Sequence, residues 1–175
     1  MDGLLFDSER IVQRSWEIAG DELGIPHMGD VIYHTLGMNR AGRNEYFRKY
    51  IREDFPFEEF GKLTRDNFWK IVDKEGLPLK KGAKELLAYG KSQGYKMAVA
   101  TSSSREYALG NLIRAGIDSY FDSVVCGDMV KKAKPDPEIY QKACESLGIQ
   151  PEYCMAFEDA PGGILSAHQA GMHVI

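Results

Sequence analysis

Apolar residues in the first part of the chain recur at the spacing of an α-helix. The first series has intervals of four, three and four positions and consists of Val12, Trp16, Ala19 and Leu23. This spacing places the four side chains on one face and predicts a helix from Ser8 to about Leu23, ended by Gly24 and Pro26. Two more helices are predicted over about residues 40–52 and 57–74, and no segment in this part of the chain has the pattern of a strand.

After Leu77 and Pro78 the pattern changes, because amphipathic helices now alternate with short runs that are apolar throughout. Such runs are typical of parallel strands buried on both faces. The predicted strands cover residues 96–101, 123–126, 154–158 and 173–175, and the predicted helices cover residues 81–93, 103–115, 136–147 and 161–170. We therefore expect an α/β protein with a three-layer, Rossmann-like parallel sheet.

Two of these helices begin with recognisable capping signals. Ser103 is followed by Glu106 three positions later, which is the spacing of a capping box. Asp136 precedes Pro137, which predicts an N-cap followed by proline at the first helical position. The predicted helix starts are therefore Ser103 and Asp136.

The all-helical stretch interrupts the α/β pattern close to its start. We predict a core domain of residues 1–9 and 77–175 and a helical cap domain of residues 10–76, inserted just after the first strand. The stretch MDGLLFD is too short to hold a strand and its loop, and HVI ends where a strand has barely begun. We therefore expect the printed sequence to be truncated at both ends.

The composition narrows the range of partners. A chain of 175 residues, 43% of them hydrophobic, is long enough to bury a core of its own. The net charge of −4 argues against binding to nucleic acid or to an anionic membrane, since both select a basic surface. There is no apolar run of the roughly 20 residues that a membrane helix needs, and no secretory signal pattern. We expect a cytoplasmic protein that binds a small molecule. The sequence leaves the oligomeric state open, with a monomer as the default expectation.

Polar side chains with a shared chemistry follow the predicted strands. Open parallel sheets bind ligands beyond the carboxyl ends of their strands, so these positions matter most. They are Asp2, Asp7, Thr101, Ser102, Ser103, Glu158 and Asp159, with Lys134 just ahead of a predicted helix. Clustered carboxylates repel one another unless a hard cation such as Mg²⁺ neutralises them. Hydroxyls and N–H groups at a helix start suit a phosphate dianion, and a lysine adds positive charge.

Four motifs in a fixed order carry a resemblance to a known family. They are MDGLLFDSE, AVATSSS, AKPDPEIY and FEDAPGGILSAHQAGM, and they extend across nearly the whole chain. The chain resembles the haloacid dehalogenase-like phosphohydrolases, in particular the branch with a helical cap that includes β-phosphoglucomutase and many small-molecule phosphatases. Four ordered motifs are far more specific than any one of them alone.

The resemblance implies a catalytic role for several residues. The family's first motif is Asp-x-Asp-Gly, and Met1 occupies its second position. The nucleophilic aspartate, which forms an aspartyl-phosphate, is therefore expected directly before Met1. Asp2 is implied to be the general acid and base, and its backbone carbonyl a ligand of Mg²⁺. Thr101 matches the family's hydroxyl motif, and Lys134 matches its lysine motif.

The remaining implied site residues bind metal or substrate. Glu158 and Asp159 match the family's final acidic pair, in which Asp159 is the expected direct magnesium ligand. We expect Ser102 and Ser103 to hold phosphate through their backbone N–H groups at the start of a helix. The sequence alone also allows a purely structural role for these serines, as a helix cap.

Three further residues are candidates for contact with the substrate. Asp7 falls where the family has a hinge beside the substrate, and Arg40 and Arg43 follow the turn LGMN, where relatives often present substrate-contacting side chains. Early arginines in a helix are also common on solvated surfaces.

These expectations lead to a function and two alternatives. The first hypothesis is a Mg²⁺-dependent phosphatase that acts on a small phosphorylated metabolite, in particular a sugar phosphate, through an aspartyl-phosphate. The second is a phosphosugar mutase, which needs a second basic phosphate site in the cap; the uncharged Leu36 before Gly37 favours hydrolysis. The third is a non-catalytic binding protein, if the chain truly lacks the nucleophile.

Overall fold

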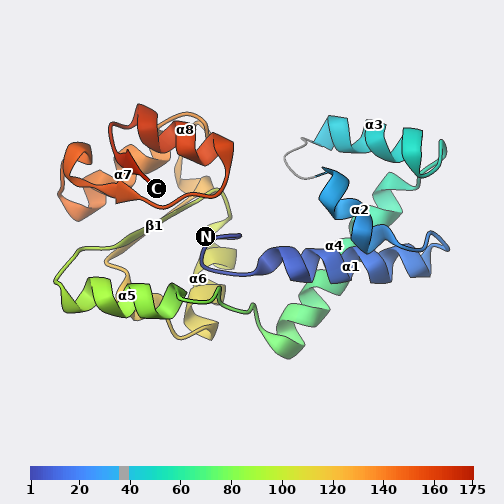
Figure 1. Cartoon of the computed structure of the whole chain (residues 1–175), viewed down its shortest axis with the longest axis horizontal. Helices are drawn as coiled ribbons and strands as arrows, with labels where there is room; N and C mark the ends of the chain where they lie inside the picture. Colours follow the sequence, from blue (N-terminus) through green and yellow to red (C-terminus); the bar gives the residue numbers. More distant parts are fainter. Residues whose placement is uncertain (36–39) are drawn as a thin grey trace. The chain divides into compact units, whose positions relative to one another are not determined.

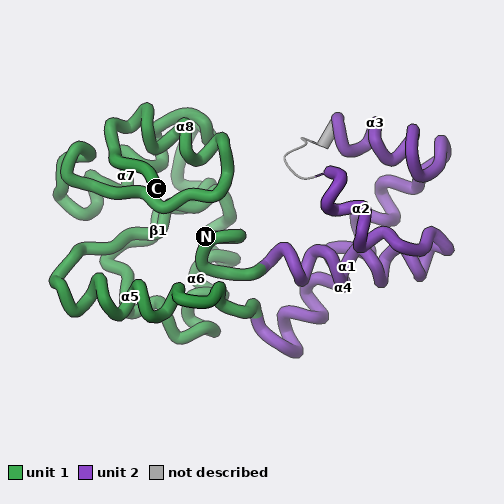
Figure 2. The backbone as a smooth tube through the Cα atoms, in the orientation of Figure 1, with its two compact units in different colours: residues 1–7, 77–175 green, residues 8–76 purple. Residues whose placement is uncertain are grey.

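The computed structural model describes residues 1–35 and 40–175 and divides the chain into two compact units. Unit 1 consists of Met1–Asp7 and Leu77–Ile175, and unit 2 consists of Ser8–Gly76 (Figure 2). Unit 1 contains all the strands assigned among the described residues, and the described part of unit 2 is helical.

The described part of unit 2 contains four helices, and their bounds are α1 (Ser8–Glu22), α2 (Met28–Thr35), α3 (Arg40–Tyr50) and α4 (Phe57–Glu75). The sequence pattern predicted α1, α3 and α4 but missed α2. This helix is only 8 residues long, although Met28, Ile32 and Thr35 are buried at helical spacing. Two turns of helix give too short a periodic signal to stand out from a loop.

Aromatic rings form the core of unit 2. Trp16, from α1, packs edge-to-face against Phe47 and Phe60, with ring centroids 5.6 Å away in both cases. Phe47 also lies 4.7 Å from Phe55, measured between ring centroids. Trp16, Phe47, Phe55 and Phe60 are all at most 5% exposed. Such offset and edge-to-face pairs stabilise a core beyond the simple burial of apolar area.

Unit 1 contains two pairs of parallel strands. β1 (Ala98–Thr101) pairs with β2 (Ser123–Cys126), and β3 (Met155–Ala156) pairs with β4 (His173–Val174). The helices of this unit are α5 (Ala83–Ser92), α6 (Arg105–Arg114), α7 (Glu138–Leu147) and α8 (Pro161–Gln169), with 3-10 turns at Asp118–Tyr120, Gly127–Met129 and Pro151–Tyr153. α7 and α8 lie on one side of β1, and α5 and α6 lie on the other (Figure 1). The predicted α/β class with parallel strands is confirmed.

Small side chains dominate the core between these strands and helices. One cluster joins β2, α7, β3 and α8, and its buried members are Val125, Ile139, Tyr140, Ala143, Ala156, Ala167 and Ala170. Ala98 and Ala100 of β1 pack against the same cluster. Because alanine adds little bulk, the strands and helices approach closely and their polar ends come near one another.

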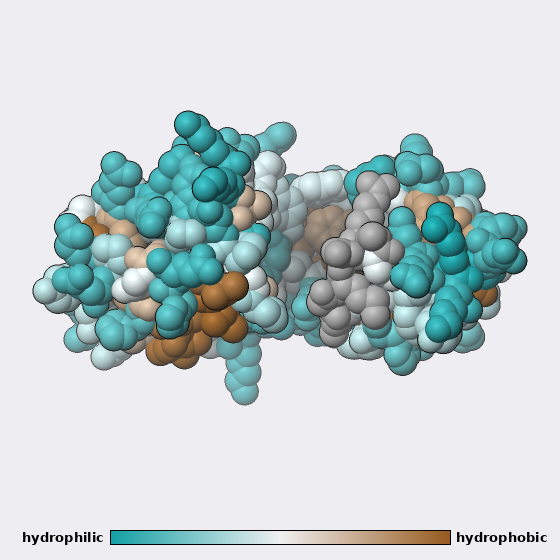
Figure 3. Space-filling model, turned by 90° about the horizontal axis from the view of Figure 1, so that it is seen from above, coloured by the Kyte–Doolittle hydropathy of each residue, from teal (hydrophilic) through white to brown (hydrophobic). Residues whose placement is uncertain are grey.

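The prediction that each strand is buried on both faces is wrong for β3. Ala156 is 5% exposed, but Met155 is 55% exposed and the adjoining Phe157 is 42% exposed. Ile164 and Leu165 of α8 are also exposed, and apolar surface is visible on unit 1 as brown atoms in Figure 3. Among the described residues β3 pairs with β4 alone, so these neighbouring side chains are not covered on their outer side.

The predicted start of α6 is also corrected. Ser104, and not Ser103, is the N-cap, and its hydroxyl accepts a hydrogen bond of 3.4 Å from the backbone N–H of Tyr107. The hydroxyl of Ser103 points elsewhere and is available to the site described below. The predicted cap of α7 is one residue off: the helix begins at Glu138, although Asp136 does accept its N–H at 3.1 Å.

The segment that leads from Met1 to unit 2 is pinned to the segment that returns from it. Asp2 and Phe6 form an isolated parallel bridge, and Phe6 forms an antiparallel bridge with Leu79. The N–H of Asp7 donates to the carbonyl of Pro78 at 2.8 Å. Phe6 is fully buried, so the first turn of the chain is anchored in unit 1 and holds Asp2 in place.

Candidate active site

The carboxylate of Asp2 is held on both of its oxygens. The hydroxyl of Ser103 donates to Oδ2 at 3.0 Å, and the hydroxyl of Tyr107 donates to Oδ1 at 2.9 Å. Both donors come from the start of α6 and the loop before it, directly after β1. Burial, followed by the negative charge of Asp2, raises the pKa of Tyr107 well above its ordinary value, so the phenol remains a donor.

The loop after β1 forms a tight turn that presents hydroxyls and N–H groups. Thr101 is 4% exposed, and its Oγ1 accepts a hydrogen bond of 3.2 Å from the N–H of Ser103. The exposed Ser102 lies against Gly127, where an added Cβ would collide with the Ser102 carbonyl. Glycine at this position therefore lets the next loop pass directly behind the turn.

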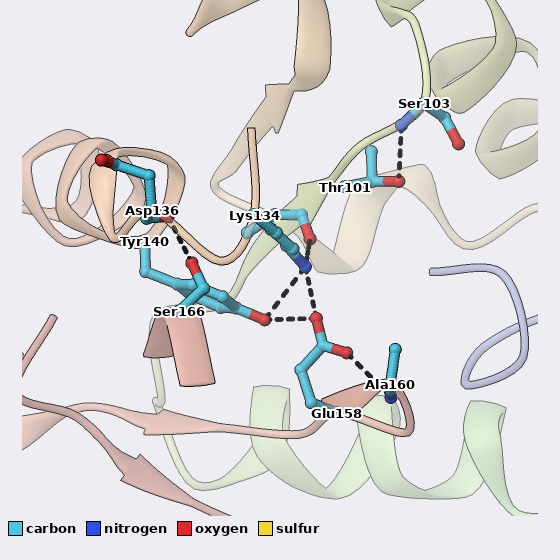
Figure 4. A network of polar contacts seen from close by, with 9 residues as sticks. Thr101, Ser103, Lys134, Asp136, Tyr140, Glu158, Ala160 and Ser166 are labelled. Atoms are coloured by element: carbon cyan, nitrogen blue, oxygen red, sulfur yellow. Dashed lines mark hydrogen bonds and ion pairs between the residues drawn. The ribbon is translucent and has the colours of Figure 1, made fainter. Parts of the chain in front are cut away.

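Lys134, in the loop before α7, and Glu158, just after β3, form a buried ion pair (Figure 4). Their side chains are only 14% and 9% exposed. The Lys134 ammonium also donates to the carbonyl of Ala100 at 3.3 Å and to the hydroxyl of Tyr140 at 3.2 Å. Tyr140 in turn donates to Glu158 at 2.5 Å, so three side chains from three segments form one closed network.

The network sets the protonation states of its members. Burial raises the pKa of Glu158, but hydrogen bonds from Lys134 and Tyr140 outweigh it, and the pKa lies below the ordinary value. Burial, together with the hydrogen bond to Glu158, raises the pKa of Tyr140. Glu158 is therefore a carboxylate and Tyr140 a neutral donor at neutral pH.

Two glycines make room for the acidic pair. Gly3 has φ +76°, and a Cβ added there would collide with the Asp159 carboxylate. A Cβ added at Gly163, in the first turn of α8, would collide with the Glu158 carboxylate. Asp159 thus lies directly beside the backbone that follows Asp2.

The loop that carries Lys134 is fixed from its C-terminal side. Glu138 accepts hydrogen bonds from the N–H groups of Lys131 and Lys132, at 3.0 and 2.9 Å. These contacts, first that of Lys131, and the ion pair with Lys142 lower the pKa of Glu138 to about 2. Ser166 of α8 donates to the Asp136 carbonyl at 2.6 Å (Figure 4), which ties the same loop to a second helix.

Contacts of neighbouring residues bring four candidate residues close together. Asp2 accepts a hydrogen bond from Ser103 in the loop after β1, and the Asp159 carboxylate lies against Gly3, the residue after Asp2. Lys134 pairs with Glu158, which directly precedes Asp159. The structure brings Asp2, Thr101, Ser103, Lys134, Glu158 and Asp159 to one edge of unit 1.

The donor set fits a hard cation, although side chains alone do not enclose one. Within residues 1–35 and 40–175, no three His, Cys, Asp or Glu side chains gather into a metal-binding group. Glu158 is engaged by Lys134, which leaves the Asp159 carboxylate and the neighbouring backbone of Asp2 as oxygen donors. The space kept open at Gly3 lets these donors approach one another. This arrangement would suit Mg²⁺, which commonly takes one or two carboxylates and completes its shell with water and phosphate.

The other candidates have contacts of their own. Asp7 forms an ion pair with Lys80 at 3.4 Å. Arg43, in unit 2, places its guanidinium 5.8 Å from the centroid of the Trp16 ring. Arg40 begins α3, but its side chain and the LGMN turn, including Leu36, lie outside the described residues.

Tyr107 and Tyr140 were not singled out from the sequence. Tyr140 is the last residue of the motif AKPDPEIY and is 5% exposed, and helical periodicity could have predicted its position on the buried face of α7. The sequence could not have predicted its hydrogen bond to Glu158, which spans 18 positions. Tyr107 reaches Asp2 across 105 positions.

The whole chain, residues 1–175, matches the family model described as haloacid dehalogenase-like hydrolase. The protein belongs to this family and is a hydrolase, as the sequence predicted. None of the described helices combines the length and apolar character that crossing a membrane requires.

Individual relatives cover the chain from end to end. The phosphorylated carbohydrates phosphatase of Thermotoga maritima is 33% identical over 175 residues, which is 100% of this chain and 81% of that protein. Hexitol phosphatase A of Escherichia coli is 31% identical over 100% of this chain and 79% of its own length. A crystal structure of a candidate β-phosphoglucomutase from Thermotoga maritima superposes with a TM-score of 0.83 at 31% identity, covering 99% of this chain and 81% of that one.

Proposed function

We propose that the protein is a Mg²⁺-dependent phosphatase of small phosphorylated carbohydrates. The observation that supports it most is that three separate segments meet in unit 1: the Asp159 carboxylate lies against Gly3, next to Asp2, and Lys134 pairs with Glu158, next to Asp159. The substrate class is supported by the relatives, which include phosphatases of phosphorylated carbohydrates and of hexitol phosphates.

Asp2 is the general acid and base in this proposal. The reaction runs through an aspartyl-phosphate on the nucleophilic aspartate that the family's first motif places before Met1. Asp2 protonates the oxygen of the departing alcohol and then takes a proton from the water that hydrolyses the aspartyl-phosphate. Its carboxylate is oriented for both steps by Ser103 and Tyr107.

Lys134 and the loop after β1 bind the phosphoryl group. The Thr101 hydroxyl accepts from the N–H of Ser103, and its own hydrogen remains to be donated to a phosphoryl oxygen. The N–H of Ser102 adds a donor in the loop before α6, and Ser103, whose N–H is already given to Thr101, is proposed to add its hydroxyl. Lys134 supplies a positive charge, and Glu158 and Tyr140 fix where it points.

Asp159 and the backbone carbonyl of Asp2 are the proposed ligands of Mg²⁺. When bound, the cation supplies positive charge that offsets the charge on the transferring phosphoryl oxygens. Glu158 orients Lys134 in this proposal, and Mg²⁺ is the other ion that Glu158 is proposed to bind.

Unit 2 is the proposed cap that selects the substrate, and its boundaries with the core are residues 7–8 and 76–77. Arg40, Arg43 and Asp7 are proposed to contact the carbohydrate. The proposed protein is a cytoplasmic monomer.

The test is a panel of sugar, hexitol and triose phosphates, assayed for released inorganic phosphate with the full-length protein in Mg²⁺ and in EDTA. We expect turnover of at least one carbohydrate phosphate and its loss in EDTA. The absence of phosphate release from every compound, or full activity in EDTA, contradicts the proposal.

Asp2→Asn tests the role of the general acid and base. We expect kcat to fall by about 10²- to 10⁴-fold, because the amide cannot exchange the proton. Asp21→Asn is the matched control, since Asp21 is exposed on α1. Beryllium fluoride with Mg²⁺ should still trap a phosphoenzyme mimic in Asp2→Asn. Undiminished turnover in this variant would contradict the assignment.

A phosphosugar mutase is the second candidate, because the Thermotoga maritima structure with a TM-score of 0.83 is described as a candidate β-phosphoglucomutase. The two activities share the aspartyl-phosphate and differ in whether water or a substrate hydroxyl receives the phosphoryl group. Incubation with β-glucose 1-phosphate and a trace of the bisphosphate separates them, since a mutase forms glucose 6-phosphate and a phosphatase releases phosphate.

A further inference from the structure

Tyr107 contacts the one side chain of the site that has to move a proton. Its hydroxyl donates to Oδ1 of Asp2 at 2.9 Å, and the donor on the other oxygen, Oδ2, is Ser103 at 3.0 Å. The two donors differ in how firmly they are held. Ser103 lies in the loop that is proposed to bind phosphate, whereas Tyr107 belongs to the first turn of α6.

The backbone of Tyr107 is anchored independently of the substrate. Its N–H donates to the hydroxyl of the N-cap Ser104, and its carbonyl accepts from the side chain of Asn111 at 2.9 Å. Asn111 is 4% exposed, and the neighbouring Ala108 is fully buried. The ring is therefore attached to a fixed turn, with its hydroxyl directed at Asp2.

A carboxylate that is anchored on one oxygen offers the other oxygen for chemistry. The donor on Oδ2, Ser103, lies in the loop proposed to bind the phosphoryl group, whereas the donor on Oδ1, Tyr107, lies outside that loop on α6. The phenol is neutral at any pH near neutrality, so it donates and does not compete for the proton. The two oxygens of Asp2 are thus chemically distinct.

We propose that Tyr107 is a positioning residue that anchors Oδ1 of Asp2, so that proton transfer to and from the substrate passes through Oδ2. This inference rests on the proposed phosphatase function and deepens it. The nearest alternative is that Tyr107 only packs against α6 and contributes to folding.

The experiment compares Tyr107→Phe with the parent on two substrates. One is the best carbohydrate phosphate from the panel, whose departing alkoxide needs a proton. The other is p-nitrophenyl phosphate, whose phenolate departs without one. Because the variant loses only the hydroxyl, we expect kcat and kcat/KM for the carbohydrate phosphate to fall about ten-fold, with KM within about two-fold of the parent value. We expect kcat/KM for p-nitrophenyl phosphate to change by less than about two-fold.

Tyr89→Phe is the matched control, because Tyr89 lies on α5 and is 58% exposed. It should behave like the parent on both substrates. Equal losses on both substrates in Tyr107→Phe, or a rise in KM alone, overturn the inference, because a misfolded or weakly binding site affects them alike. A parent protein that hydrolyses neither substrate overturns the proposed function and this inference with it, whereas an active parent with an unchanged Tyr107→Phe overturns the inference alone.

Discussion

The two units differ in the kind of contact that stabilises each of them internally. In unit 2 a group of aromatic rings fills the core, with centroids between 4.7 and 6.4 Å apart, and its ion pairs Arg14–Glu75 and Arg52–Asp54 are exposed. In unit 1 the cluster that joins β2, α7, β3 and α8 is rich in alanine, and the ion pair Lys134–Glu158 is buried. Large rings stabilise a fold by burying much apolar area. Small side chains let strand ends and helices approach closely enough to form polar contacts. A change in the aromatic core of unit 2 should therefore affect stability alone, whereas a change at the unit 1 site should affect the chemistry as well.

The largest expected effect comes from Lys134→Met in unit 1. We expect kcat to fall by about 10²- to 10³-fold, because a preorganised charge beside the phosphoryl group is lost. We also expect a loss of about 3–5 kcal/mol in unfolding free energy, since Glu158 is left buried and unpaired. Steady-state kinetics and urea unfolding measure the two effects.

A double variant separates the two effects. Lys134→Met combined with Glu158→Gln should recover much of the stability and none of the activity, because no buried charge remains unpaired. Lys131→Met, at an exposed position of the same loop, is the control and should resemble the parent. Recovery of activity in the double variant would contradict the role given to Lys134.

The next largest effect comes from Phe47→Ala in unit 2. Phe47 is 3% exposed and contacts the rings of Trp16, Phe55 and Phe60. We expect a loss of about 3–5 kcal/mol in the free energy of unfolding, from lost burial and the cavity left behind. Tyr50→Ala, at a ring that is 60% exposed, should cost far less. Denaturant titration at low temperature, followed by tryptophan fluorescence, measures the difference, and equal losses would contradict the comparison.

Gly3→Ala should affect metal use more than folding. The added Cβ would collide with the Asp159 carboxylate, so we expect the Mg²⁺ concentration for half-maximal activity to rise roughly ten-fold or more. Gly24→Ala is a matched control, because Gly24 also has positive φ, +68°, but nothing lies within 4 Å of its Cβ position. Both variants carry the backbone strain of an L-residue at positive φ. The same Mg²⁺ dependence in both variants would show that Asp159 does not act with the metal.

The smallest effect is expected from Glu138→Gln and concerns acid stability. The pKa of Glu138 in the folded protein is about 2, below the ordinary value of 4.5, so its carboxylate favours the folded state above pH 4.5. This contribution is lost as the pH falls from about 4.5 toward 2. Glu138→Gln should therefore reduce Tm slightly near pH 6 and flatten its decline over the acidic range. Glu145→Gln, exposed on the same helix, should follow the parent curve.

Regular patterns in the sequence predicted most of the fold. β2 occupies the predicted residues 123–126, and the predicted helix over residues 161–170 corresponds to α8 at Pro161–Gln169. Periodicity reports which side chains are buried together, and it works where an element is long enough to show a period. It failed for the 8-residue α2 and for β3, because the exposure of Met155 depends on which strands pair, and pairing is a long-range property.

The chemistry of the site was predictable as residue types and much less as contacts. The resemblance to a family supplied Asp2, Thr101, Lys134 and Asp159 as candidates. Nothing in the sequence indicated that tyrosines on two helices would donate to Asp2 and Glu158, since those partners are set by the packing of α6 and α7. Local capping rules also assigned the N-cap to Ser103, whereas the neighbouring Ser104 takes that role.

The pinned segments on either side of unit 2 have a consequence for how such a protein can diversify. Asp7 and Pro78 are joined by a backbone hydrogen bond of 2.8 Å, and Lys80 and Leu5 by another of 2.8 Å. The inserted residues thus leave and re-enter unit 1 at adjacent points. A different insert, or a short loop, could replace unit 2 at this point without changing the path of the unit 1 backbone. The substrate selectivity of such a protein could therefore change while its catalytic residues stay in place.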